Sequence, residues 1–211
     1  METAAALALS STRNDALLVF IDLPNVAYKG SSELMFPQQS LANNFIKFPL
    51  DALSQIIAER FSDNADEIEA HLYSQYVNAD STREKLKYQA KQAGFKFVTT
   101  SNLSTSISVR KDIDHLIINS MWRLTSRLAF DYVRGRMQTS SGEPRNGVIE
   151  IVLVSGDGDF YQTLVDITEN LERFNMKIHI HIVGWRDTMH QAYKRSSLVQ
   201  SITYLDDFNL I

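Results

Sequence analysis

Short apolar runs alternate with helical patterns along most of this chain of 211 residues. The first run, ALLVFID at residues 16–22, is apolar, favours β-structure and ends in Asp22, as expected of a buried central strand. Further strands are expected towards the end of 67–77 and at 95–100, 148–155, 176–185 and 201–204. Strands that alternate with helices in this way predict a parallel sheet covered by helices on both faces.

The helical patterns occupy the intervals between these runs. Helices are expected at 40–61, 80–94, 110–130, 159–175 and 188–195. The pattern at 110–130 has apolar side chains spaced i, i+3, i+4 and i+7, which is typical of a helix packed on a sheet. We therefore predict a three-layer α/β/α fold with a mainly parallel central sheet of five to six strands.

The domain organisation is simple. Residues 1–14 are expected to form a flexible N-terminal arm, and residues 15–211 a single domain. The Gly-, Ser-, Pro- and Arg-rich segment 134–147 is read as a surface loop within that domain, because the strand after it is needed to complete the sheet.

Composition excludes several classes of site. The formal net charge of -4 offers no bulk electrostatic case for nucleic acid or an anionic membrane, although a local basic patch remains compatible with it. The chain has no cysteine, so disulfides, thiolate zinc sites and Cys nucleophiles are ruled out, and a cytoplasmic location is expected. No apolar run approaches the roughly 20 residues that span a bilayer.

Acidic side chains fall repeatedly where ligands bind open α/β sheets, beyond the carboxyl ends of the strands. Asp22 closes the first strand, Asp157 and Asp159 follow the fourth, and Asp112 and Asp114 open the helix before it. If the strands that end near Asp22 and Asp157 are neighbours, four or five carboxylates converge at one edge of the sheet.

Clustered carboxylates repel one another and raise each other's pKa unless a cation neutralises them. Oxygen ligands without Cys or a His cluster favour Mg²⁺ or Mn²⁺ over zinc. Such an ion typically takes one or two carboxylates directly and keeps several waters. This arrangement suits attack of an activated water on a phosphodiester.

Most of these acids, though not Asp157, also have a structural interpretation. Gly156 and Gly158 allow a sharp turn and close approach of a ligand, and Asp159 is then well placed to cap the following helix. Asp157 has no comparable structural explanation. Asn25 either makes a turn after Pro24 or positions Asp22.

Three motifs in this order resemble the NYN family of PIN-like nucleases, which includes the LabA-like proteins. FIDLPN at 20–25 resembles the family's first strand, KDID at 111–114 its middle helix, and SGDGDF at 155–160 its best-known signature. The resemblance spans about residues 16 to 208. It implies a PIN-like Rossmannoid fold and metal-dependent cleavage of RNA.

Carried onto this chain, the resemblance implies a metal-binding core of Asp22, Asp114 and Asp157. Asp159 would be a fourth, water-mediated ligand and Asn25 a supporting polar group, which makes these five residues the implied catalytic set.

The chain departs from the NYN pattern in its middle helix. Asp112 replaces the usual Gly and adds a carboxylate, while LIINSMW at 116–122 lacks a second acid and places Asn119 and Ser120 there instead. The alternative to a ribonuclease is therefore a catalytically weak or degenerate domain that binds RNA or a protein partner. Other acidic Rossmann-like enzymes are disfavoured. A phosphatase of this kind needs an Asp at the position of Pro24, and a Toprim enzyme needs a Glu at the position of Asp22.

RNA, single-stranded or structured, is the expected partner, and its phosphates require basic side chains near the acids. A homo-oligomer or a protein partner is also compatible with the sequence. Six basic residues are the predicted RNA contacts. Arg110 and Lys111 lie beside the acids of KDID, Arg186 follows the fifth strand, and the loop just before the strand that delivers Asp157 carries Arg134, Arg136 and Arg145.

Overall fold

The computed structural model describes residues 14–27, 47–62, 65–74, 80–99, 108–135, 147–208 and 210. Six strands run through this part of the chain: β1 (Asn14–Asp22), β2 (Ala65–Ser74), β3 (Lys96–Thr99), β4 (Val148–Val154), β5 (Lys177–Gly184) and β6 (Val199–Tyr204). The helices between them are α1 (Leu23–Ala27), α3 (Leu50–Phe61), α4 (Asp80–Gln92), α5 (Ser108–Val133), α6 (Tyr161–Glu172) and α7 (Gln191–Arg195). Two short 3₁₀ turns complete the elements, η1 (Gly158–Phe160) and η2 (Leu205–Asp207).

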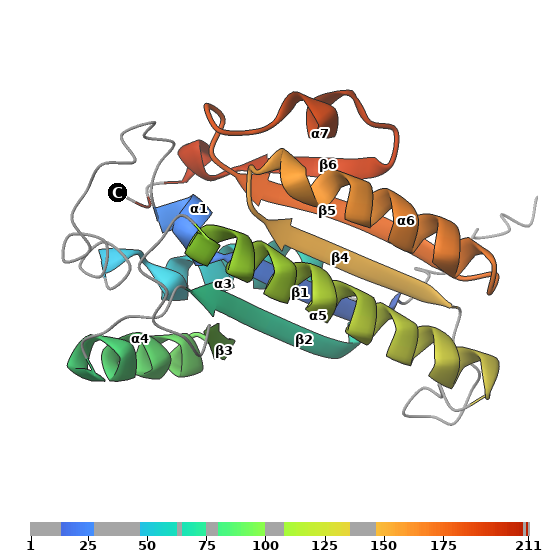
Figure 1. Cartoon of the computed structure of the whole chain (residues 1–211), viewed down its shortest axis with the longest axis horizontal. Coiled ribbons are helices and arrows are strands. Elements are labelled where there is room, and N and C mark those ends of the chain that lie inside the picture. The colour runs from blue at the N-terminus through green and yellow to red at the C-terminus, as the bar shows by residue number, and fades with distance from the viewer. Residues whose placement is uncertain are drawn as a thin grey trace, which may run out of the picture.

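The strands form one sheet in the order β3-β2-β1-β4-β5-β6, and every described strand pair is parallel. This is the strand order of the Rossmann fold. The chain builds outwards from β1 to β3 and then returns to place β4 on the other side of β1 (Figure 1). The order therefore reverses between β1 and β4, which is where ligands bind in such sheets.

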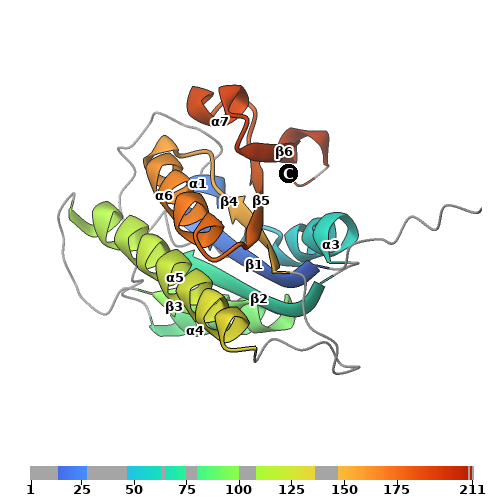
Figure 2. The ribbon, with the colours of Figure 1, turned by 90° about the vertical axis from the view of Figure 1, so that its right-hand side faces the viewer.

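Helices cover both faces of the sheet, as Figure 2 shows from the end of the molecule. Alternate residues of β1 point to opposite faces, so Leu17 and Val19 join one core while Leu18 and Phe20 join the other. The first core is completed by α3 and α4, and the second by α5 and α6. The predicted three-layer α/β/α fold is confirmed, with six parallel strands.

Most predicted elements are observed, but the strand expected towards the end of 67–77 begins earlier, at Ala65, and the short helix α1 was not predicted. The pattern at 110–130 forms α5, and the expected helix at 40–61 is present as α3 from Leu50, with Pro49 at its N-cap. Its first part and most of the predicted arm at 1–14 lie outside the described residues. The predicted helix at 159–175 differs at its start, because η1 precedes α6.

The long helix α5 runs along the sheet in the direction opposite to the strands (Figure 1). It is 26 residues long and begins beside the carboxyl ends of the strands, on the left in Figure 1, and ends near their amino ends. None of the helices in the described part of the chain combines the length and apolar character needed to cross a bilayer.

Candidate active site

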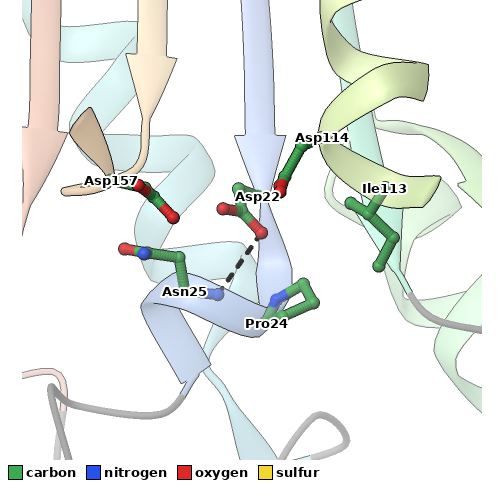
Figure 3. A pocket seen from close by; sticks show the side chains of 6 residues that line it. All are labelled: Asp22, Pro24, Asn25, Ile113, Asp114 and Asp157. Atoms are coloured by element: carbon green, nitrogen blue, oxygen red, sulfur yellow. Dashed lines mark hydrogen bonds between the residues drawn. The ribbon is translucent and has the colours of Figure 1, made fainter. Parts of the chain in front are cut away.

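A pocket lies at the point where the strand order reverses. Its lining comes from β1, α1, α5 and the loop after β4, and consists of Asp22, Pro24, Asn25, Ile113, Asp114 and Asp157. It encloses about 230 Å³, part of which is open solvent. Figure 3 shows the carboxylates of Asp22, Asp114 and Asp157 approaching from the end of β1, the first turns of α5 and the loop after β4.

Asp22 is the most deeply placed of the three acids and is 4% exposed. Its Oδ2 accepts a hydrogen bond from Ser155 Oγ at 3.1 Å, and its Oδ1 accepts a longer one from the Asn25 N–H at 3.4 Å. Burial raises the pKa of Asp22 to about 7, with further upward contributions from Asp114 and Asp157, while the hydrogen bonds from Ser155 and Asn25 lower it. Near neutral pH the site therefore holds a carboxyl group that readily exchanges its proton.

Ser155 connects Asp22 to Asp157. Its buried hydroxyl donates to Asp22 Oδ2 and accepts a hydrogen bond from the Asp157 backbone N–H at 3.2 Å. The sequence argues against Ser155 as a hydrolase nucleophile, because the chain has no G-x-S-x-G elbow. Its supporting role was missed, because the role depends on β4 lying next to β1, and only the small polar residue at the strand end hinted at it.

Asn25 links the two loops of the site from the other side. Its side-chain Oδ1 accepts a hydrogen bond from the Gly156 N–H at 2.9 Å, while its own backbone N–H donates to Asp22. Of the two interpretations, the structure supports the positioning of Asp22, through the Asn25 backbone N–H, whereas the Asn25 side chain bonds to Gly156 and not to a turn of its own. The Asn25 carboxamide also faces the pocket (Figure 3).

The prediction that Asp159 caps the following helix is wrong. Asp157 is the N-cap of η1, and its Oδ1 accepts a hydrogen bond from the Asp159 N–H at 3.1 Å. Phe160 precedes α6 and makes no side-chain cap. Asp157 therefore has the structural role that was assigned to Asp159, in addition to its place in the pocket. Asp159 is exposed and does not line the pocket.

The two glycines of SGDGDF serve close packing and not an unusual backbone conformation, since neither has a positive φ. A Cβ on Gly156 would lie 2.8 Å from the Thr188 carbonyl oxygen, and one on Gly158 would lie 2.5 Å from the His190 ring. The segment after β5 therefore packs directly on the loop that carries Asp157.

The middle helix contributes Asp114 to the pocket, as predicted. The Asp112 side chain is outside the described part of the structure. Where a second acid was expected, Asn119 is exposed and the Ser120 side chain is hydrogen-bonded to Tyr73. The described acids of α5 near the pocket therefore reduce to Asp114.

The predicted RNA contacts are only partly described. The side chains of Arg110 and Lys111 and the whole of Arg136 and Arg145 lie outside the described residues. Arg134 lies one residue beyond the far end of α5, with its guanidinium 3.7 Å from the centroid of the Phe130 ring. At about 1.5 Å per residue it is about 30 Å along the helix from Asp114, so the structure does not bring it to the pocket.

Arg186 follows β5 at the carboxyl edge, but it is held by the C-terminal turn η2. Its backbone N–H donates to Asp206 at 2.7 Å, its guanidinium donates to Asp207 at 2.9 Å, and the guanidinium stacks on Tyr204. A phosphate would have to compete with these partners for its charge.

The donor set fits Mg²⁺ or Mn²⁺ in its chemistry, because carboxylate and carboxamide oxygens are the ligands these ions prefer. Among the described side chains, no three acids or histidines are close enough together to hold a metal ion as a ready-made group. Of the four or five carboxylates expected to converge, three of those that the structure describes line the pocket, and Asp159 does not. Mg²⁺ commonly binds through one or two carboxylates and water, which three acids can provide.

The chain matches none of the protein-family models or curated proteins with which it was compared. The fold and the arrangement of the pocket therefore carry the functional argument.

Proposed function

We propose that this protein is a metal-dependent ribonuclease of the NYN type. The observation that carries the proposal is the state of Asp22, a buried acid whose pKa rises to about 7 beside two further acids, at the reversal point of a Rossmann-like sheet. A structural acid gains nothing from such an environment, since burial and like charge both disfavour its ionised form. A bound divalent cation would compensate for this cost.

In this proposal Asp22, Asp114 and Asp157 would hold Mg²⁺ or Mn²⁺, and the ion would supply an activated water and neutralisation of the charge that develops on a phosphodiester. Ser155 orients the Asp22 carboxylate through its hydroxyl, and Asn25 holds the loop after β4 against the end of β1. Asp159, exposed beside this loop, is proposed to act through water.

The choice of RNA as substrate rests on the resemblance of FIDLPN, KDID and SGDGDF to NYN motifs. The pocket is consistent with this choice, because the three motifs contribute Asp22, Asp114 and Asp157 to it. Of the predicted basic contacts, Arg110 and Lys111 stand within four residues of Asp114 in the sequence.

Cleavage of labelled single-stranded and structured RNA tests the proposal, with Mn²⁺, with Mg²⁺ and with chelator. Asp157→Asn and Asp114→Asn should each lower the metal-dependent rate by more than the roughly 10- to 100-fold that loss of an outer-shell partner costs. The control is Glu172→Gln, which changes an exposed acid at the C-terminal end of α6, the end farther from Asp157 in the sequence. Wild-type rates in Asp157→Asn would show that the metal-site assignment is wrong.

The same experiment addresses the second candidate, a degenerate domain that binds RNA or a protein partner. The observation in its favour is Ser120, where the expected second acid is replaced by a hydroxyl bonded to Tyr73. RNA binding without cleavage under every metal condition would support this alternative, and Ser120→Asp would then be the variant to test for gain of activity.

A further inference from the structure

The loop that carries Asp157 receives a hydrogen bond from a distant part of the chain. Tyr193, in the short helix α7, is buried, and its hydroxyl donates to the main-chain carbonyl of Asp157 at 2.5 Å. The two residues are 36 positions apart in the sequence, and β5 separates them. The sequence carries no signal for this contact.

The backbone of Asp157 is thus held on both sides. Its N–H donates to Ser155 Oγ at 3.2 Å, and its carbonyl accepts from Tyr193. Its side chain is held as well, because Oδ1 accepts from the Asp159 N–H. The same Ser155 hydroxyl reaches Asp22, so these restraints define where the Asp157 carboxylate lies relative to Asp22.

Tyr193 is itself well anchored. Its ring packs edge-on against the Tyr161 ring, with the centroids 6.0 Å apart. His190 caps α7 by accepting from the Ala192 N–H, and its backbone N–H donates to the Gly156 carbonyl at 2.9 Å. The hydroxyl therefore belongs to a fixed frame around the loop.

The pKa of Tyr193 is raised above its usual range, mainly by burial and next by the charge of Asp157. The phenol therefore stays protonated and remains a hydrogen-bond donor at any pH at which the protein would work.

We propose that Tyr193 is a positioning residue, which holds the Asp157 backbone and thereby directs the Asp157 carboxylate into the pocket that it shares with Asp22. This inference rests on the proposed function, in which Asp157 binds the metal. A ligand held in place before the metal arrives does not need to be ordered on binding, so losing the restraint should weaken metal binding without removing a ligand.

Tyr193→Phe removes the hydroxyl and keeps the ring. The matched control is Tyr161→Phe, which removes the neighbouring hydroxyl that bonds to Ser196 and not to the loop. Three measurements on the full chain are compared: hydrogen exchange of residues 155–160 without metal, Mn²⁺ affinity by calorimetry without RNA, and kcat and KM for RNA cleavage.

For Tyr193→Phe we expect faster exchange at 155–160 with β4 unchanged, Mn²⁺ affinity lower by about tenfold as for lost outer-shell partners, and a lower kcat at constant KM. Tyr161→Phe should change none of these by more than about twofold. Equal effects of the two variants, or faster exchange throughout β4 in Tyr193→Phe, would overturn the positioning role in favour of general structural support.

Failure of the proposed function would appear differently. If the wild type neither binds Mn²⁺ nor cuts RNA, the proposed metal site is wrong. Hydrogen exchange alone then tests the role of Tyr193. Exchange at 155–160 that is accelerated only in Tyr193→Phe would then still support positioning, and unchanged exchange would refute it.

Discussion

The side-chain oxygen of Asn25 accepts a hydrogen bond from the backbone N–H of Gly156 at 2.9 Å. Asn25 follows β1 and Gly156 follows β4, so this bond joins the two chain segments that meet where the strand order reverses. Gly156 is buried, so if the Asn25 oxygen were removed, no water could reach the Gly156 N–H to accept its hydrogen bond instead. The bond therefore stabilises the geometry of the whole pocket.

Asn25→Ala should lower the free energy of unfolding by about 1–3 kcal/mol, because it leaves a buried donor unsatisfied. Asn25→Asp keeps an acceptor oxygen for the Gly156 N–H, but at high pH it adds a negative charge beside Asp22. Its loss in free energy of unfolding should therefore be smaller at low pH than at high pH. Urea denaturation measures both. Gln55→Ala, which breaks an exposed side-chain bond to Glu59, is the control and should cost less than about 0.5 kcal/mol. Equal losses in Asn25→Ala and Gln55→Ala would contradict the bridging role.

Asp22 should make the metal-free protein less stable as pH rises. Its pKa is about 7 in the folded protein and near 3.8 when unfolded, so between these values the folded state holds more protons. Stability from this group is thus fully present below about pH 4 and is lost as pH approaches 7. At about 1.4 kcal/mol per pKa unit, the loss is on the order of a few kcal/mol.

Asp22→Asn removes this titration, so its stability relative to wild type should increase between pH 5 and pH 8 in chelator. Thermal melting across that range checks the expectation. Asp166→Asn, at an exposed position of α6, controls for the loss of one negative charge. A stability difference between Asp22→Asn and wild type that does not vary with pH would show that burial does not perturb Asp22 in the folded state.

The two glycines of the loop should differ in their tolerance of a side chain. In Gly156→Ala the new Cβ meets the backbone carbonyl of Thr188, whereas in Gly158→Ala it meets the His190 side chain, which can move if it gives up its hydrogen bond from the Ala192 N–H. We expect Gly156→Ala to cost more free energy of unfolding than Gly158→Ala. In a double-mutant cycle measured by urea denaturation, His190→Ala should reduce the cost of Gly158→Ala and leave that of Gly156→Ala unchanged.

Arg134→Ala should leave the cleavage of RNA unchanged. The guanidinium stacks on Phe130 at the end of α5 opposite Asp114, so its loss should cost only the roughly 0.5–1 kcal/mol of an exposed cation–π contact. Cleavage rates and unfolding by urea measure the two expectations, with Asp157→Asn as the inactive reference. A several-fold loss of activity in Arg134→Ala would mean that RNA extends along the whole of α5.

Much of the fold was predictable, because strand and helix signals are local. Two examples are the apolar run before Asp22 and the apolar stripe along α5. Each depends on side chains within a few positions of one another. The edge of the sheet that carries the site was also predictable, since the acids of FIDLPN and SGDGDF directly follow two strands. Parallel strands place such residues on the same edge.

The error over Arg134 had a geometric origin. The loop 134–147 precedes β4 in the sequence, and it was predicted to lie near the site because β4 delivers Asp157. A loop that enters a strand lies at its amino end, however, and Gly147 accordingly bonds to Lys177 at the start of β5. Proximity in sequence to a functional strand therefore placed Arg134 at the wrong edge of the sheet.

The sequence by itself determined the alternation of strands and helices and the position of Asp22 and Asp157 at strand ends, because both follow from periodicity and local order. Only the tertiary structure decided that β4 pairs with β1, that Ser155 joins Asp22 to Asp157, and that Tyr193 holds the Asp157 carbonyl. These contacts join residues that are 36 to 133 positions apart. They exist because packing the two faces of one sheet brings together segments that have no local interaction.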